Sequence, residues 1–103
     1  MAQRVRWTET AWNDLKNIAD FIAQDSPYYA AALVREIRDA ARSLKRFAER
    51  GRIVPEFDSP NIRELFIRHY RLIYDLQTEE VRILALIHGA RDLSALIRKS
   101  AKA

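Results

Sequence analysis

Residues Ile62 to Leu76, IRELFIRHYRLIYDL, contain the clearest indication of how this chain folds. This stretch contains two short runs, IRELFI and RLIYDL, that are rich in branched aliphatic and aromatic residues. Residues of these types favour β-strands, and the tight RHYR link around His69 suits a turn. The stretch therefore predicts two antiparallel strands that are neighbours in one sheet, with His69 as a turn residue.

Similar runs flank this pair on both sides. IVPEF begins at Ile53 and VRILALI begins at Val81, and the runs are separated by DSPN and QTEE. We therefore expect three or four consecutive antiparallel strands. Pro55 has no backbone N–H to donate, so it should lie on an edge strand or at a bulge.

The last run is apolar on both faces of the predicted strand. Because side chains alternate along a strand, one face should hold Val81, Ile83, Ala85 and Ile87. The other face should hold Arg82, Leu84, Leu86 and His88. A strand with this pattern belongs in the middle of a sheet that helices cover on at least one side.

The N-terminal half predicts a short strand at VRW (5–7) and then a helix. Thr8 is a good N-cap, and the helix should stop near Asp25. Ser26-Pro27 then joins a capping residue to a proline that suits the first turn of a second helix. The apolar stripe of the first helix consists of Ala11, Leu15, Ile18 and Ile22.

The second helix should pack against the first as an antiparallel hairpin, since almost no loop separates them. We expect it to end at Gly51, where glycine takes a left-handed conformation without strain. After Gly89, a short C-terminal helix can begin at Asp92. The stripe of the second helix consists of Leu33, Ile37, Ala40 or Ala41, Leu44 and Phe47.

These elements predict a single α+β domain over residues 1–103. An N-terminal strand is followed by a two-helix hairpin packed on a three- to four-stranded antiparallel sheet, and a short C-terminal helix ends the domain. Apolar residues make up 49% of the chain and charged residues 31%, as in ordinary folded proteins. A fold of this kind does not by itself define a function.

Several classes of protein are disfavoured by the composition. The start MAQRVRW has no apolar signal core and no run is long enough to span a bilayer, so we expect a cytoplasmic protein without membrane contact. The chain has no cysteine, which excludes a disulfide framework, a thiolate zinc site and a cysteine nucleophile. The two histidines lack a third ligand at a recognisable spacing. We therefore predict neither a metal site nor a cofactor.

A basic segment accounts for the net charge of +4. In it Glu49 is the only acidic residue, so an acidic peptide or a nucleic acid is the expected partner. The alternative is a solvated helix end whose cations complement the helix dipole. The basic residues of the segment are Arg42, Lys45, Arg46, Arg50 and Arg52.

The order of motifs along the chain resembles the RelE/ParE superfamily of type II toxins, and most closely its ParE-type, plasmid-stabilisation branch. The motifs are DLKNIADFIAQDSP in the first helix, GRIVPEF after the second, NIRELFIRHYRLIYDL across the strand pair and ILALIHGARDL at the end. The resemblance covers Val5 to Leu93 and depends on the combination, because each motif alone is weak. It implies that residues 1–103 form one toxin domain.

The resemblance also implies the partners. A cognate antitoxin with an acidic or amphipathic tail would neutralise the toxin, and operator DNA would be contacted only through that antitoxin. ParE-type members inhibit DNA gyrase, which is the leading expectation for this chain. RelE-type members cut mRNA on the ribosome, which is the alternative.

The alternative requires a metal-independent endoribonuclease site with a base, an acid and cations for the phosphate. Arg63, Arg71, His88 and Arg91 are the candidates, with Glu56 as a second proton carrier. The set is incomplete compared with RelE-like nucleases, because no lysine lies between Lys45 and Lys99 and no tyrosine follows His88. His88 can equally be a strand-end residue bonded to a neighbour, and Arg63 can pair with Asp75 or Glu56 across the sheet.

For these reasons we assign no catalytic residue and expect a contact surface instead. Basic side chains would form most of it, and the amphipathic tail LSALIRKSAKA would add apolar contacts or simply close the core. The predicted partner-binding residues are Arg42, Arg46, Arg50, Arg52, Arg63, Arg71, Arg91, Leu96 and Ile97.

Overall fold

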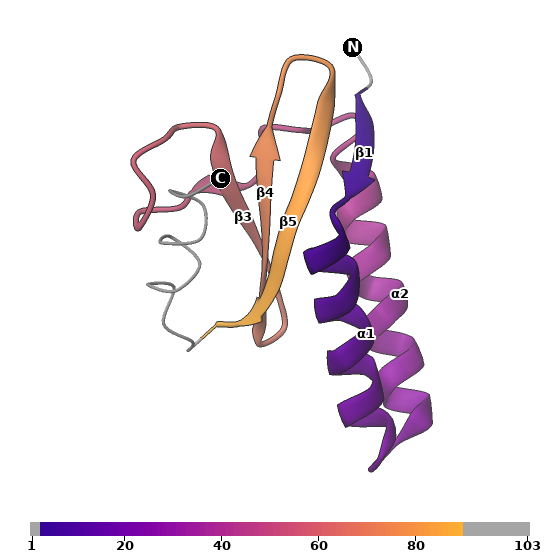
Figure 1. Cartoon of the computed structure of the whole chain (residues 1–103). Helices are drawn as coiled ribbons and strands as arrows, with labels where there is room; N and C mark the ends of the chain where they lie inside the picture. Colours follow the sequence, from indigo (N-terminus) through magenta and orange to yellow (C-terminus); the bar gives the residue numbers. More distant parts are fainter. Residues whose placement is uncertain (1–2, 90–103) are drawn as a thin grey trace.

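A computed structural model describes residues 3–89, in which one strand, two helices and four more strands follow one another (Figure 1). This order confirms the α+β class. The C-terminal helix predicted from Asp92 lies outside the described residues. The elements are β1 (Arg4–Trp7), α1 (Glu9–Ala23), α2 (Pro27–Ser43), β2 (Arg52–Ile53), β3 (Ile62–Ile67), β4 (Tyr70–Leu76) and β5 (Glu80–His88).

The sheet has five strands in the order β1-β5-β4-β3-β2. The predicted run of consecutive antiparallel strands after the helices is confirmed as β2 to β5, but the sheet as a whole is mixed. The additional strand is β1, which pairs in parallel with β5 from Arg4 opposite Glu80 to Trp7 opposite Ile83. The helical hairpin carries the chain from this edge of the sheet to the other, where β2 lies. β5 lies between β1 and β4, which confirms its predicted central position.

The helix starts are those that the sequence predicts. The Thr8 hydroxyl accepts a hydrogen bond from the Ala11 N–H at 3.2 Å and donates one to the Ile83 carbonyl at 2.8 Å. Ser26 caps α2 by accepting from the Tyr29 N–H at 3.1 Å. Figure 1 shows α1 and α2 antiparallel on one side of the sheet. Neither of them has the length and apolar character needed to cross a bilayer.

The main core lies between the hairpin and the sheet. Phe47 was predicted to belong to it but is 64% exposed, because α2 ends at Ser43 and the following turns carry the ring outward. The core residues on the helices are Ala11, Leu15, Leu33, Ile37 and Ala41, and Leu44 joins them as the C-cap of α2. Those on the strands are Leu65, Ile67, Leu72, Tyr74, Val81, Ile83 and Leu86.

A β-bulge in β5 overturns the predicted alternation of its faces. Tyr74 is opposite Ile83 while Ile73 is opposite Ala85, so Leu84 is an extra residue in the pairing. One extra residue reverses the faces beyond it. Val81 and Ile83 therefore pack on the helix side, and Ala85 and Ile87 belong to a second cluster on the opposite side.

Gly51 has a different role from the predicted helix cap. Its φ angle is not positive, and α2 has already ended at Ser43. A Cβ atom at this position would lie 2.6 Å from the Tyr74 hydroxyl and 2.7 Å from the Glu64 carbonyl oxygen. Glycine is required here because the backbone passes too close to β3 and β4 for any side chain.

Candidate functional site

Two charged residues are buried on the sheet face that points away from the helices. Glu64 on β3 and Arg71 on β4 have side chains that are 0% and 6% exposed. Their strand neighbours Leu65 and Leu72 belong to the helix-side core. Because side chains alternate along strands, Glu64 and Arg71 share the other face.

Every charge in this cluster has a partner. Arg71 Nε donates to Glu64 Oε1 at 2.5 Å, and its two terminal nitrogens donate to the Glu56 carboxylate at 3.3 Å each. Arg52, on the edge strand β2, donates through Nε to Glu64 Oε2 at 2.6 Å. Burying a charge is costly unless it is paired and hydrogen-bonded, and this arrangement meets that condition. We call Arg52, Glu56, Glu64 and Arg71 the sheet-face quartet.

The quartet is electrically balanced, since two guanidinium groups face two carboxylates. Burial alone would lower the pKa of Arg71, but its hydrogen bonds to Glu64 and Glu56 raise it, so the guanidinium stays charged. The hydrogen bond from Arg71 also lowers the pKa of Glu56. The centre of this face therefore carries no net positive charge.

The lowered pKa of Glu56 predicts a pH-dependent contribution to stability. At a pH above 4.5, the ordinary pKa of a glutamate, ionised Glu56 stabilises the folded state. This contribution is lost as the pH falls through the lower pKa that Glu56 has in the folded state. Glu56→Gln should therefore lower the urea midpoint at neutral pH, and the difference from the wild type should disappear in acid. Because the Glu56 side chain is 37% exposed, the effect should be small. Glu79→Gln, which removes an exposed carboxylate, is the control and should change the urea midpoint at neutral pH little. A pH-independent Glu56→Gln difference would contradict the prediction.

An aromatic ring lies over the quartet at the surface. Phe66 on β3 is 56% exposed, with the guanidinium carbons of Arg52 and Arg71 5.2 Å and 5.9 Å from its ring centroid. Cations at these distances are attracted to the face of an aromatic ring. Exposed aromatic and arginine side chains are also the types that dominate protein–protein binding energies.

The candidate nuclease residues within the described chain do not converge. Arg63 lies on the opposite face from Arg71, and its Nη1 donates to the Glu49 and Gly51 carbonyls at 3.1 Å each. The predicted pairing of Arg63 with Asp75 or Glu56 was therefore wrong.

His88 lies elsewhere on the sheet, at the end of β5 and opposite Tyr70. Its ring meets that of Tyr70 edge to face at 5.7 Å and stacks on His69 at 6.3 Å. His69 lies in the turn between β3 and β4, as predicted. Arg91 lies outside the described residues.

The predicted basic contact surface is divided between two parts of the molecule. Arg42 and Arg46 lie at the end of α2 and in the turn after it, whereas Arg52 belongs to the sheet-face quartet. Arg50 donates to the Ser43 hydroxyl at 2.7 Å. The predicted contacts Leu96 and Ile97 lie outside the described residues.

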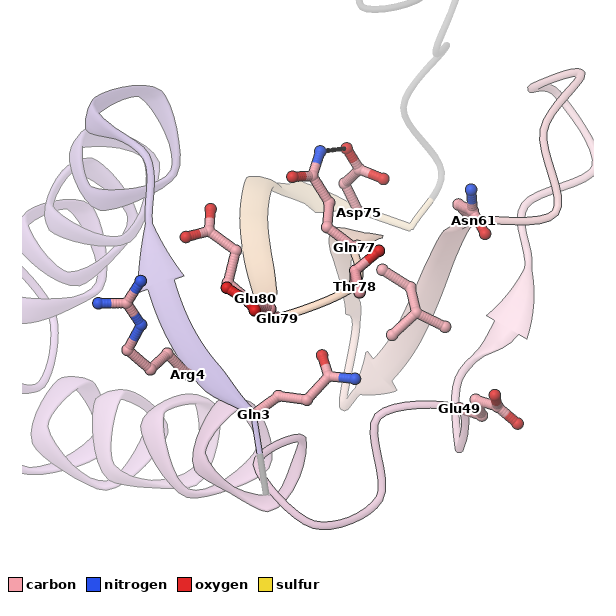
Figure 2. Close-up of a pocket in the computed structure, with 10 residues that line it drawn as sticks. Gln3, Arg4, Glu49, Asn61, Asp75, Gln77, Thr78, Glu79 and Glu80 are labelled. Atoms are coloured by element: carbon pink, nitrogen blue, oxygen red, sulfur yellow. Dashed lines mark hydrogen bonds between the residues drawn. The ribbon is translucent and has the colours of Figure 1, made fainter. Parts of the chain in front are cut away.

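A cavity of about 1010 Å³ lies at the end of the sheet where β4 leads into β5 (Figure 2). Among the described residues, Arg4 is the one basic side chain that lines it, and Asp75 accepts a hydrogen bond from Gln77 Nε2 at 2.9 Å. This acidic cavity repels phosphate and does not suit a nucleic acid. Its acidic lining residues are Glu49, Asp75, Glu79 and Glu80.

The architecture has solved counterparts in proteins of toxin–antitoxin systems. A chain of the chromosomal ParDE system from P. aeruginosa superposes with a TM-score of 0.70 at 23% identity, over 84% of this chain and 96% of that one. A chain of the RelBE2 toxin–antitoxin complex from Mycobacterium tuberculosis superposes with a TM-score of 0.58 at 25% identity, over 85% and 99%. These similarities define the class by its fold, which is a small α+β domain that also occurs in toxin–antitoxin systems.

Sequence comparison identifies the family. Residues 5–93 match the ParE toxin of type II toxin–antitoxin systems, parDE. Toxin RelE2 of Caulobacter vibrioides is 37% identical over 92 residues, which are 88% of this chain and 99% of that protein. The chain therefore belongs to the ParE toxin family, within the RelE/ParE superfamily.

Proposed function

We propose that this toxin acts by protein contact on DNA gyrase rather than by cutting RNA. The observation that carries the proposal is that the charges of the sheet-face quartet balance one another, with Glu64 and Arg71 buried. A phosphate that approaches Arg71 would meet the carboxylates of Glu64 and Glu56, which already accept the hydrogen bonds that Arg71 donates. The exposed ring of Phe66 above them suits a protein surface instead.

Reaction chemistry gives a second reason. RNA cleavage without a metal needs a base, an acid and free cations around one phosphate. Arg71 is bound to carboxylates, Arg63 is bound to backbone carbonyls on the other face, and His88 is at the end of a different strand. Among the described residues, these groups do not surround a common point.

We further propose that a cognate antitoxin with an acidic or amphipathic tail neutralises the toxin. The relatives named above are toxins or parts of toxin–antitoxin systems, which supports such a partner. The chain also exposes large apolar side chains that a partner can cover. Those with the largest exposed fractions are Tyr28 (83%), Phe21 (70%), Phe47 (64%) and Phe66 (56%).

A supercoiling assay with purified gyrase tests the proposed target. Added toxin should block supercoiling of a relaxed plasmid, and Phe66→Ala should raise the concentration needed by about tenfold, because removing an interface anchor typically costs about 1–2 kcal/mol. Phe21→Ala is the matched control, since it removes another exposed phenylalanine from α1 and should change the result little.

Unchanged supercoiling at a large excess of toxin would reject the proposal. The competing function, a ribosome-dependent mRNA endonuclease, would then be supported if added toxin cleaved mRNA in a translation reaction. His88→Ala and Arg63→Ala should abolish that cleavage if the candidate nuclease residues carry it.

A further inference from the structure

A row of cations runs along the outer side of α2 and into the turn after it. We call Arg35, Arg38, Arg42 and Lys45 the α2 cation row; successive members are three, four and three residues apart. This spacing places them along one side of a helix, over about 15 Å. A shallow depression lined by Arg38, Arg42 and Lys45, together with Val5 and Trp7, confirms that the last three share a surface.

Most side chains of the row are available to bind a partner. Arg42 pairs with Asp39 at 3.3 Å, and both side chains are more than 60% exposed, at 64% and 69%. An exposed pair of this kind is weak and easily exchanged for another partner. Within residues 3–89, no hydrogen bond or ion pair involves the side chains of Arg35, Arg38 or Lys45.

Helix electrostatics explains only part of the row. Cations in the last turn stabilise a helix through its dipole, which accounts for Arg42 and Lys45. The dipole interaction falls off within one turn, so it does not account for Arg35 and Arg38. Like charges one turn apart destabilise a helix slightly, so the row has a cost that an anionic partner would remove.

The surroundings of the row distinguish between possible partners. Between Arg35 and Lys45 the large apolar side chains Ile37 and Leu44 are buried in the core, and the exposed Tyr28 and Phe47 lie before and after the row. A docking peptide helix or a membrane surface needs exposed apolar anchors on the same face. A phosphate backbone needs only positive charge and hydrogen-bond donors. Arginine suits it well, because its planar fork binds phosphate through two parallel hydrogen bonds.

We propose that the α2 cation row binds the backbone phosphates of duplex DNA directly and without reading the base sequence. A straight row of cations on a rigid helix suits the regular line of phosphates beside a groove. The inference goes beyond the proposed action on gyrase and does not depend on it. It also differs from the family expectation that the toxin contacts operator DNA only through its antitoxin.

Fluorescence anisotropy of the full chain with a labelled duplex of about 20 base pairs tests the row. If four phosphates are neutralised, the logarithm of the binding constant should fall against the logarithm of salt concentration with a slope of about −3 to −4. Arg38→Gln with Lys45→Gln should reduce this slope by about 2 and weaken binding about tenfold or more at 0.1 M salt.

Arg4→Gln with Lys16→Gln is the matched control. It also removes one exposed arginine and one exposed lysine, but from outside the row. This variant should change the slope by less than about 0.5. Equal losses in both variants would show an effect of net charge alone and would overturn the proposal. Preferential binding of poly-L-glutamate over the duplex would assign the row to an acidic polypeptide and would also overturn it.

Discussion

Glu64→Ala is expected to lower the free energy of unfolding by about 3–5 kcal/mol. The substitution removes the carboxylate that binds Arg71 and Arg52 at 2.5 Å and 2.6 Å. Arg71, whose side chain is 6% exposed, would keep only the longer contacts to Glu56 and the ring contact with Phe66. A buried charge that loses its main partner is among the costliest single changes in a folded protein. Urea denaturation followed by circular dichroism measures the effect.

Two further variants show whether the cost comes from the unpaired charge. Glu64→Leu combined with Arg71→Met removes both charges and should destabilise less than Glu64→Ala alone, because apolar residues of similar volume often replace a buried pair well. Glu80→Ala breaks two more exposed pairs, with Arg6 at 3.3 Å and Arg82 at 3.4 Å, and should cost no more than about 1 kcal/mol. A loss for Glu64→Ala no larger than that for Glu80→Ala would refute the account of the quartet.

Features that depend on local sequence were predicted correctly. The caps at Thr8 and Ser26 and the turn at His69 each depend on a few neighbouring residues, and the structure confirms them. Features that depend on distant contacts were missed. Nothing local shows that Leu84 is a bulge, since the pairing of β4 with β5 determines it. The role of Gly51 likewise depends on Tyr74, which is 23 residues away.

The candidate site was only partly predictable for the same reason. The sequence indicates Arg52, Glu56 and Arg71 as single candidate residues, but it does not show that Glu64 joins them. A carboxylate inside the apolar strand IRELFI was the available signal, because a buried acid requires a cation nearby. The sequence predicts one basic surface from Arg42 to Arg52. In the structure, α2 ends at Ser43 and β2 begins at Arg52, so these basic residues lie in different parts of the molecule.

Tyr74 connects the centre of the sheet to the segment after α2. Its side chain is fully buried in the main core. The hydroxyl accepts a hydrogen bond from the Gly51 N–H at 3.0 Å and donates one to the Ala48 carbonyl at 2.7 Å. Burial raises the pKa of this hydroxyl, so the folded protein holds the neutral form. One side chain thus provides both apolar packing and the two polar contacts that hold the segment in place.

Tyr74→Ala should therefore destabilise the protein by about 3–5 kcal/mol, because it leaves a large cavity and two unpaired backbone groups. Tyr74→Phe keeps the ring and should cost only about 1–3 kcal/mol, for the polar groups alone. Because the pKa of Tyr74 is raised in the folded state, its neutral hydroxyl should contribute fully to stability below pH 10, the ordinary pKa of tyrosine. This contribution should fall as the pH rises further. Urea midpoints from about pH 8 to 11 should thus decline more steeply for the wild type than for Tyr74→Phe. Parallel declines, or equal losses for both substitutions at neutral pH, would show that the buried hydroxyl does not hold the segment.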